Sequence, residues 1–395
     1  MKINLAVIFG GKSVEHEVSV ISAVQAMYSL DKEKYEILPL YMTKKNEFYT
    51  GSKLFEIENY KDIPALLKGC ERVIFTSDGD EAFIEHYPAK KFGNNKIARI
   101  DVALPVVHGT NVEDGILQGY LETLGIPYAG CDVLSSAVGM DKYVMKVMLK
   151  EAGVNVLPGF CFNSKDFYRD PSDILDKIEL ATGYPAIVKP VNLGSSVGIK
   201  VASDRQSLEA ALENATLYAG RILVERAITN LREINCSVLG DYMTARASVC
   251  EEPLSAGEIL SYDDKYKGGS KGSKGMSSAQ RKIPADLTEE ERKTIETMAV
   301  KTFRVLGCAG VARIDCMIDK DSGEIFVNEI NTIPGSLSFY LWEPSGVTYK
   351  ELLDELIDIA LKRNREKEKL SFSYDTNLLS ENSLSGLKGA KGTKN

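Results

Sequence analysis

Four polar residues in the C-terminal part of the chain have the types and spacing of a metal site. Arg313 and Asp315 lie two positions apart in one apolar segment, and Glu329 and Asn331 lie two positions apart in the next. Side chains two apart on a strand point to the same face, so each pair shares a face if both segments are strands. A hairpin register that sets Asp315 opposite Glu329 would bring two carboxylates and an amide together, and such oxygen ligands suit Mg²⁺.

The alternative for this segment is an ordinary antiparallel hairpin whose polar face is solvated. The residues that alternate with the polar ones are apolar, namely Ile314, Cys316, Val327 and Ile330. We therefore expect the polar face to be covered as well. Carboxylates in such a place need partners or a metal ion.

A lysine and a loop of small residues form a second candidate site. Lys189 stands at the end of an apolar segment, and the loop that follows ends at Gly198. Backbone N–H groups of such a loop can approach a phosphate closely, and the lysine supplies charge. The pattern is not that of a P-loop, because the lysine precedes the glycines and no helix follows at once. On spacing alone, a tight turn and a phosphate-binding loop fit equally well.

Two N-terminal segments, residues 10–19 and 108–115, carry polar residues directly after apolar runs. Glu15 at this position could bind a substrate ammonium. The alternative is the start of a helix, with a serine cap and acids in the first turn, and the spacing favours that reading. His108 could likewise bind a substrate, or it could be a polar residue satisfied at the end of a strand.

The N-terminal elements that position these residues form an α/β domain. Apolar runs at residues 3–9, 36–42 and 100–107 alternate with segments of helical spacing. Strands that alternate with helices predict a mainly parallel sheet, whose ligands bind at the carboxyl ends of the strands. We expect this domain to span residues 1–134.

The rest of the chain predicts two further domains and a tail. A central domain at residues 135–222 holds the lysine loop, and longer strands at residues 223–364 indicate a large antiparallel sheet. The polar residues 365–395 are expected to be disordered. For a helix at residues 141–152, apolar spacing places inward Val144, Val147 and Met148, and elsewhere Lys142, Lys146 and Lys150.

The composition is that of a soluble, enzyme-sized protein. The chain has 395 residues, a formal charge of −8, 44 % hydrophobic residues and 26 % charged residues. The acidic balance argues against nucleic-acid binding, and no apolar run approaches the ~20 residues of a membrane span. Seven cysteines without a CxxC pair and only three histidines exclude a zinc ribbon and a histidine metal cage. We expect a cytoplasmic protein without nucleic-acid or membrane partners.

Six motifs, taken in order, resemble those of the D-alanine–D-alanine ligase family, which belongs to the ATP-grasp carboxylate–amine ligases. Each motif is weak alone, but their order over residues 1–363 is specific. They are Gly10-Gly11 with Glu15 and Val18-Ser19; His108-Gly109 with Glu113-Asp114-Gly115 and Gln118-Gly119; Gly139-Met140-Asp141-Lys142; Lys189-Pro190 with Gly194-Ser195-Ser196-Val197-Gly198; Arg313-Ile314-Asp315; and Asn328-Glu329-Ile330-Asn331-Thr332 with Pro334-Gly335.

The resemblance implies a fold, cofactors and partners. The fold would be an N-terminal parallel-sheet domain of Rossmann-like, pre-ATP-grasp type, followed by an ATP-grasp fold of two α+β subdomains. ATP would lie between those subdomains with two Mg²⁺ ions, for which Mn²⁺ can substitute. The family also implies a homodimer whose other partners are the small molecules D-alanine and ATP.

The resemblance also implies which residues bind the nucleotide. Lys142 and Lys189 would contact its phosphates, Glu225 would read the adenine amino group, and Glu233 would hold the ribose hydroxyls. The segment before Glu233, residues 229–232, is one residue longer than usual. The other nucleotide-binding residues would be Ser195, Ser196, Arg226 and Ile228. The two metal ions would be held by Asp315, Glu329 and Asn331.

The family's reaction assigns the remaining residues. ATP activates one D-alanine as an acyl phosphate, and the amine of a second D-alanine then attacks it. Glu15, assisted by His108, would hold the first D-alanine, and Arg313 with the N–H of Gly335 would stabilise the oxyanion. Ser195 and Tyr266 would link Glu15 to a closing loop. The other substrate-binding residues would be Glu113, Lys265, Tyr340 and Leu341, with Lys265 pairing with Glu113.

Two features depart from the family's usual sequence. Tyr266 is typical of peptide-forming members, but Tyr340 stands where the family has a serine that binds the acceptor carboxylate. The closing loop is also strongly basic, with Lys265, Lys267, Lys271, Lys274, Arg281 and Lys282. The expected product is D-alanyl-D-alanine for peptidoglycan synthesis. The alternatives are a D-alanine–D-X or other dipeptide ligase with a larger or more acidic acceptor, and a catalytically silent nucleotide-binding regulator.

Overall fold

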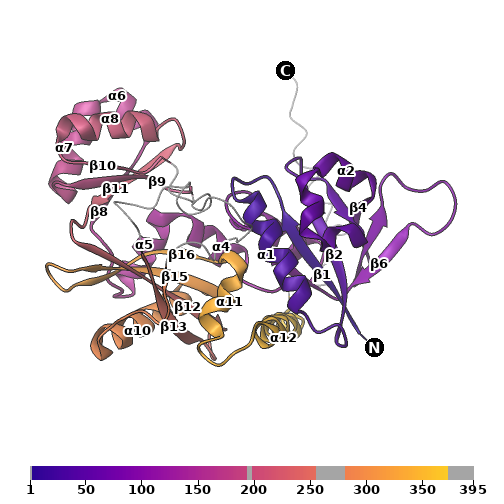
Figure 1. The fold of residues 1–395 in the computed structure, drawn as a ribbon. Coiled ribbons are helices and arrows are strands. Elements are labelled where there is room, and N and C mark those ends of the chain that lie inside the picture. Colours follow the sequence, from indigo (N-terminus) through magenta and orange to yellow (C-terminus); the bar gives the residue numbers. More distant parts are fainter. Residues whose placement is uncertain (1, 194–197, 255–280, 372–395) are drawn as a thin grey trace, which may run out of the picture. The chain divides into compact units, whose positions relative to one another are not determined.

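The N-terminal sheet is parallel around β1 and antiparallel along the rest of its width. The computed structural model describes residues 2–193, 198–254 and 281–371. β1 pairs in parallel with β2 and β7, and the other neighbours are antiparallel. The strand order is β6-β5-β4-β3-β2-β1-β7 (Figure 1), at Lys96–Ile100, Glu81–His86, Glu71–Asp78, Phe48–Thr50, Tyr35–Met42, Ile3–Gly10 and Val102–Val106.

The parallel strands β2, β1 and β7 agree with the prediction, but the sheet is not mainly parallel, because its other pairings are antiparallel. The burial of the parallel strands explains why they could be predicted. Every residue of β7, and every residue of β1 from Leu5 onward, is buried. Such strands read as continuous apolar runs. The sequence does not predict β3 to β6, because strands such as β4 bury only a few residues. The helical segments of this region are α1 His16–Ser29, η1 Ser52–Phe55, η2 Ile57–Lys61, α2 Ile63–Lys68 and α3 Ile116–Thr123.

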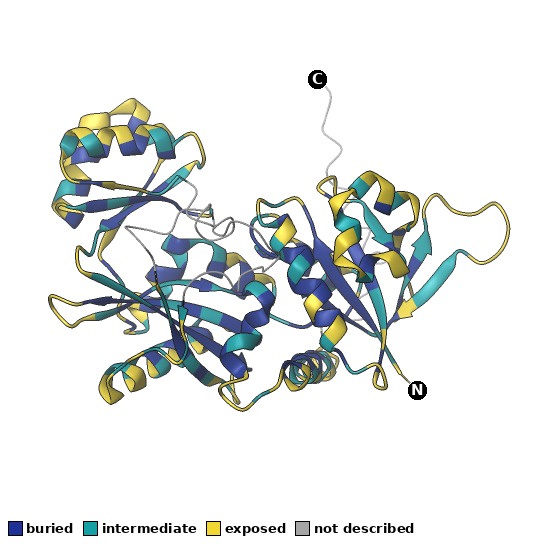
Figure 2. Cartoon of the chain, in the orientation of Figure 1, coloured by how far each residue is buried: buried dark blue, intermediate teal, exposed yellow. Residues whose placement is uncertain are grey.

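A second, antiparallel sheet carries Lys189. Its order is β10-β9-β11-β8, at Lys200–Ala202, Ala186–Pro190, Arg221–Arg226 and Gly159–Asn163. Apolar side chains of α7 and α8 share one core with this sheet, while their outer surfaces are exposed (Figure 2). The helices are α6 Ser164–Arg169, α7 Pro171–Thr182 and α8 Arg205–Ala215. The predicted boundary at residue 222 cuts through β11, which pairs with β8 and β9 and so belongs with this sheet.

The third sheet is the large antiparallel one that the C-terminal sequence predicts. Its order is β14-β13-β12-β15-β16, at Arg281–Lys282, Arg246–Pro253, Leu231–Gly240, Gly310–Asp319 and Ile325–Asn331. α10, Glu289–Val305, begins with a capping box between Thr288 and Glu291 and packs Ile295, Ala299 and Phe303 into the core below the sheet. The alternating apolar residues of β15 lie in the same core, which leaves its polar residues on the other face.

The predicted inward face of the helix at residues 141–152 is correct only in part, because Val144 and Met148 pack against the core but Val147 does not. In α5, Lys142–Glu151, the buried side chains are Lys142, Met145, Lys146 and Leu149, and Val147 is 50 % exposed. The preceding helix, α4, spans Val133–Met140. Apolar spacing fails here because two buried lysines find carboxylate partners, which a hydrophobic pattern does not reveal.

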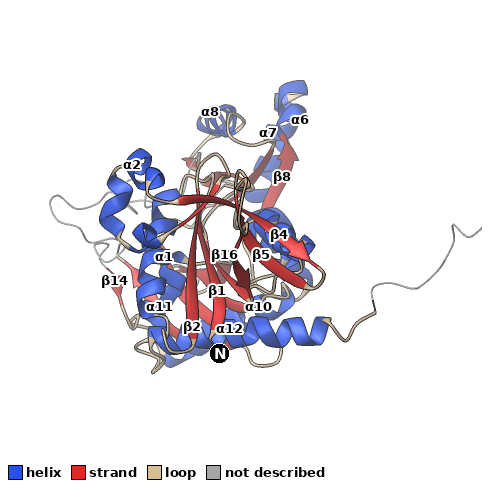
Figure 3. Cartoon of the chain, turned by 90° about the vertical axis from the view of Figure 1, so that its right-hand side faces the viewer, coloured by secondary structure: helices blue, strands red, loops and turns tan. Residues whose placement is uncertain are grey.

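The C-terminal helix supports the N-terminal domain. After η4, Gly335–Ser338, and α11, Phe339–Trp342, the chain forms α12, Tyr349–Lys367. Leu352, Leu356 and Ile357 of α12 lie in the same core as β1 (Figure 3). The helix extends past the start of the predicted tail, whose residues from 372 lie outside the described part. None of the helices among the described residues is long and apolar enough to cross a membrane.

Candidate active site

The hairpin of β15 and β16 has the predicted register. Asp315 lies opposite Glu329 and Arg313 lies opposite Asn331, with a bulge after Asp315. The guanidinium of Arg313 donates to both oxygens of Asp315, at 2.7 and 2.8 Å, and the Asn331 amide donates to Asp315 Oδ2 at 3.0 Å. These polar side chains therefore meet on one face, as the spacing predicts.

A lysine from α5 meets this hairpin. Lys142 Nζ lies 3.2 Å from Glu329 Oε2 and donates to the carbonyl oxygen of Leu193 at 2.9 Å. The side chains of Arg313 and Asp315 are only 17 % and 15 % exposed, so the polar face is largely covered, as predicted. Two carboxylates, an amide and a lysine thus lie in one place.

A buried group of three charged side chains contacts the hairpin at Asn328. Lys189 of β9 donates to Glu225 Oε2 at 2.9 Å and to Asn328 Oδ1 at 3.0 Å, and Lys146 of α5 pairs with Glu225 Oε1. Glu225 is fully buried. Burial alone would raise the pKa of Glu225, but the two ammonium groups lower it overall. Burial lowers the pKa of Lys146 to about 8, although Glu225 opposes that shift.

The histidine at the end of β7 joins α1 to the segment after β16. His108 Nδ1 lies 2.8 Å from the Ile333 carbonyl oxygen, and Nε2 lies 3.1 Å from Ser22 Oγ. A carbonyl can only accept, so Nδ1 carries the proton. Ser22 Oγ also accepts the N–H of Ser336 at 2.9 Å. Burial lowers the pKa of His108, so the ring is neutral and its Nε2 accepts the serine proton.

Glu113 also binds the segment after β16, as His108 does. Its carboxylate accepts the N–H groups of Gly109 and Ile333, both at 2.9 Å, and the hydroxyl of Thr332 at 3.2 Å. Burial raises the pKa of Glu113 to about 7, although the backbone donors oppose it. Its predicted partner Lys265 lies outside the described residues.

Glu15 lies against the loop of His108. It is the N-cap residue of α1, but within the described residues its side chain makes no capping hydrogen bond. Ser13 Oγ accepts the N–H of Glu15 at 3.1 Å, and Glu17 lies in the first turn of α1. The serine bond and the acid of the capping interpretation are therefore present, with Glu15 rather than Ser13 as the N-cap residue. A Cβ added to Gly109, which has φ +81°, would lie 2.8 Å from Glu15 Oε2 and 2.5 Å from Ser13 Oγ. The absence of a side chain at Gly109 thus leaves room for the Glu15 carboxylate.

Tyr340 belongs to a polar cluster beyond Arg313. Its hydroxyl donates to Glu251 Oε1 at 3.2 Å, and the guanidinium of Arg281 lies 4.6 Å from its ring centroid. Glu251 also accepts from Arg281 at 3.3 Å and from Asn235 at 3.0 Å. Leu341, which follows Tyr340 in the sequence, is fully buried. Gly335 is the first residue of η4.

The predicted adenine and ribose residues lie on β11, β12 and the turn between them. Ile228 packs on a small apolar cluster of Leu157, Met317 and Phe326. Arg226 pairs with Asp319 at 3.6 Å, and Glu233 lies opposite Met317 in the pairing of β12 with β15. Four predicted site residues lie outside the described part of the chain: Ser195, Ser196, Lys265 and Tyr266.

The sequence interpretation misses several residues that the structure brings into the site. Lys146 and Asn328 contact predicted site residues, and Ser22 and Glu251 hold His108 and Tyr340. Lys146 follows Lys142 by four positions, so the two lysines share one helix face, and this spacing is a signal that could have found it. For Ser22 and Glu251 the sequence gives no comparable signal.

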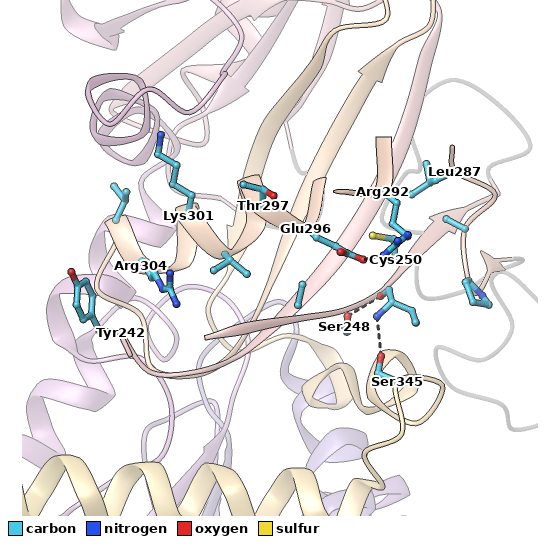
Figure 4. Close-up of a pocket in the computed structure, with 16 residues that line it drawn as sticks. Tyr242, Ser248, Cys250, Leu287, Arg292, Glu296, Thr297, Lys301, Arg304 and Ser345 are labelled. Atoms are coloured by element: carbon cyan, nitrogen blue, oxygen red, sulfur yellow. Dashed lines mark hydrogen bonds and ion pairs between the residues drawn. The ribbon is translucent and has the colours of Figure 1, made fainter. Parts of the chain in front are cut away.

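One pocket lies away from these residues. It has a volume of about 880 Å³ and lies between β13 and α10, where Figure 4 shows Arg292, Glu296 and Lys301 along the helix. Among the described residues, none of the predicted site residues lines it. A second pocket, of about 610 Å³, is lined in part by Lys146 and Glu225.

The hairpin donors fit a hard divalent cation. The described residues hold no group of three His, Cys, Asp or Glu side chains placed for a metal ion. The hairpin set contains two carboxylates and one amide, so it would bind a metal only with further oxygen ligands. Mg²⁺ usually binds through one or two carboxylates with phosphates and waters, so this set matches its chemistry.

Comparisons with known proteins agree with this arrangement. The family models described as D-ala D-ala ligase N-terminus and C-terminus match residues 4–131 and 148–358. A D-alanine--D-alanine ligase of Thermosipho melanesiensis is 39 % identical over 380 residues, covering 95 % of this chain and 98 % of the relative. One from Acetivibrio thermocellus is 39 % identical over 381 residues, covering 93 % and 98 %.

Solved structures are also similar. The VanG D-Ala:D-Ser ligase of Enterococcus faecalis has a TM-score of 0.76 and 31 % identity, covering 91 % of this chain and 100 % of that one. The D-alanine--D-alanine ligase of Bacillus anthracis complexed with ATP has a TM-score of 0.64 and 27 % identity, covering 92 % and 99 %. The family models together match most of the chain, and this chain belongs to the D-alanine–D-alanine ligase family.

Proposed function

We propose that this protein is an ATP-dependent ligase that joins two D-alanines through an acyl phosphate. The products would be D-alanyl-D-alanine for peptidoglycan synthesis, ADP and phosphate. The observation that carries the proposal is the meeting of Lys142 with Glu329 at 3.2 Å and of Lys189 with Asn328 at 3.0 Å. Lysines that can bind phosphates thus contact the strand that carries Glu329, a carboxylate that can bind a metal, and phosphoryl transfer needs both kinds of group.

In this proposal Lys142 and Lys189 hold the phosphates of ATP. Asp315, Glu329 and Asn331 would hold two Mg²⁺ ions, for which Mn²⁺ can substitute. Bound there, the metal would supply positive charge against the phosphate oxygens. Glu225, Arg226, Ile228 and Glu233 would line the nucleotide site, with Ser195 and Ser196 of the glycine loop. Catalysis in such a site comes mainly from positioning and electrostatics.

The substrate site lies next to the hairpin. Glu15 would accept the ammonium of the first D-alanine, and neutral His108 would keep the adjoining backbone in place through Ser22 and Ile333. Arg313 and the N–H of Gly335 would stabilise the oxyanion that forms when the second amine attacks. The hydrogen bonds of Arg313 to Asp315 already fix its guanidinium in the hairpin, so little reorganisation is needed.

Loop closure and assembly complete the proposal. Ser195 and Tyr266 would connect Glu15 to the closing loop, and Lys265 would reach Glu113. Tyr340 and Leu341 would border the acceptor. We also propose a cytoplasmic homodimer, with domain divisions near residues 134 and 364 and a central division moved beyond β11.

A second candidate function is a ligase with a different acceptor. The hydroxyl of Tyr340 already donates to Glu251, and Arg281 packs on its ring, so the acceptor site differs from one formed around a serine. A polar acceptor would then replace D-alanine in the second position. The similar solved structures include a D-Ala:D-Ser ligase, which is consistent with this candidate.

One assay separates these functions. Purified protein with ATP and Mg²⁺ is given D-alanine alone, D-alanine with D-serine, or D-alanine with larger or acidic D-amino acids. Phosphate release and product mass are measured. D-alanyl-D-alanine as the main product supports the first proposal, and a mixed dipeptide supports the second. ATP binding without release of phosphate that depends on D-alanine would contradict both and favour a regulator.

A further inference from the structure

A lysine outside the predicted site completes a buried chain of charges. Lys146, Glu225 and Lys189 come from α5, β11 and β9, and each side chain is at least nine-tenths buried. Each ammonium takes a different oxygen of the Glu225 carboxylate. Lys189 also donates to Asn328, which precedes Glu329 on β16 in the proposed metal-binding hairpin. Among the described residues, the ion pairs that connect Lys146 with Lys189 and the proposed phosphate site run through Glu225.

The charges in this chain do not cancel. Two ammonium groups face one carboxylate, so one positive charge remains. Without Lys146, the Glu225 carboxylate would face Lys189 alone, and the two would form a neutral pair. A neutral pair attracts phosphate oxygens much less than an unpaired ammonium does, most of all in a site shielded from water. A buried carboxylate with only one cation is also poorly satisfied.

We propose that Lys146 is a positioning residue whose ammonium neutralises Glu225, so that the positive charge of Lys189 stays uncompensated and in place for the phosphates of the nucleotide. The inference rests on the proposed function, because it assumes that Lys189 binds those phosphates. It gives Lys146 no contact with the substrate. Its effect passes through Glu225 and should appear in nucleotide binding.

The direction of a pH effect follows from the groups that face Lys146. These are Glu225 and Glu329, which favour its charged form, and Lys189, which with burial opposes it. Its pKa is lowered to about 8, so its charge is present below about pH 8 and is lost above. Nucleotide binding of the wild type should therefore weaken above pH 8. Lys146→Arg, which keeps its charge at these pH values, should lose that dependence.

The test compares Lys146→Met with Lys177→Met, which removes an exposed lysine from α7, away from this group of charges, and serves as the control. Lys146→Met should raise the KM for ATP and the Kd for ADP about tenfold, equal to about 1.4 kcal/mol. The KM for D-alanine should change little. The control should bind ADP as the wild type does.

The double variant Lys146→Met with Glu225→Gln decides the charge argument. Because Glu225 also lines the proposed nucleotide site, the double variant is compared with Glu225→Gln alone. With the carboxylate gone, Lys189 no longer needs Lys146, so adding Lys146→Met to Glu225→Gln should change the Kd for ADP little. A merely structural role predicts additive losses and an unchanged pH profile. Thermal melting reports whether each variant folds. If Lys146→Met alone does not fold, Glu225→Gln is compared with the double variant instead.

Two outcomes would overturn the inference while leaving the proposed function intact. One is equal ADP affinity of Lys146→Met and Lys177→Met in an active enzyme. The other is a Lys146→Met substitution that weakens ADP binding as much in the Glu225→Gln background as in the wild type. Failure of the proposed function looks different, because the wild-type protein would then release no phosphate in response to D-alanine.

Discussion

Arg313 shows how the hairpin can fix a side chain for which we propose a chemical role. Its planar fork donates to both oxygens of Asp315, which fixes the guanidinium on the polar face of the hairpin. A lysine would keep the charge but could not make two parallel hydrogen bonds. The proposed stabilisation of the oxyanion needs a donor fixed before the reaction, so geometry as well as charge matters here.

Arg313→Lys should lower kcat by about 10²- to 10³-fold, the usual cost of removing an oxyanion donor. Steady-state kinetics with D-alanine and ATP would measure this. The matched control is Arg246→Lys, which changes an arginine that also donates twice to one carboxylate, that of Glu355, but away from the site. If Arg313→Lys and the control had similar kcat values, the oxyanion assignment would be lost.

Glu113 gives a pH-dependent prediction. Its pKa is raised to about 7 in the folded protein by burial and lies near 4.5 in the unfolded chain. The folded state therefore binds more protons than the unfolded state between pH 4.5 and 7, so this residue makes stability fall as pH rises through that window. Above pH 7 the penalty is complete and constant, at about 3 kcal/mol.

The measurement is the free energy of unfolding of wild type and Glu113→Gln from pH 4.5 to 8. A neutral amide does not titrate, so the stability difference between the two proteins should change across the window and then level off. Glu113→Gln also loses an acceptor for the N–H of Gly109, which shifts its stability by a pH-independent amount. A difference that stays constant from pH 4.5 to 8 would contradict the raised pKa.

At the scale of elements, repeating sequence patterns predict strands and helices, but they do not predict features that depend on contacts with distant residues. β1, β7, β15 and β16 were predictable because apolar runs and period-two spacing are local properties. The hairpin donors followed from that spacing together with a register that the structure confirms. The inward face of α5 was predicted only in part, because burial of Lys142 and Lys146 depends on carboxylates that come from distant strands.

The link between α1 and the segment after β16 is another feature that local patterns cannot show. Ser22 accepts the N–H of Ser336 and donates to His108, which in turn donates to the carbonyl of Ile333. Three separate parts of the chain thus fix the backbone beside Gly335. A serine within an apolar helix face gives no sign in the sequence that it has these partners.

Ser22→Ala should loosen this link. We expect a loss of stability of about 1–2 kcal/mol, because two buried hydrogen bonds lose their common partner. The KM for D-alanine should rise more than the KM for ATP, since the link borders the substrate side of the site. Ser29→Ala on the same helix, whose hydroxyl bonds only to the Gln25 carbonyl among the described residues, is the control. Equal changes in both KM values would argue against a local effect.

At the scale of the whole molecule, the site draws on all three sheets. Glu15 and His108 come from the N-terminal sheet region, Lys189 from the second sheet, and the carboxylates from the third. Nucleotide and metal bound together should therefore stabilise the fold as a unit, because a ligand that binds only the folded state adds its binding free energy to stability. At a hundredfold excess over Kd this amounts to about 2.7 kcal/mol.

Thermal unfolding with ADP can test this argument and the metal assignment together. ADP with Mg²⁺ should raise the Tm of the wild type more than ADP with EDTA. Asp315→Asn should keep the shift seen with EDTA but lose most of the extra shift from Mg²⁺, since it removes one of the two carboxylates. Asp321→Asn, in the exposed turn of the same hairpin, is the matched control and should respond as the wild type does. If Asp315→Asn kept the full Mg²⁺ response, the metal would have to bind elsewhere, and the meeting of lysines and carboxylates would need another explanation.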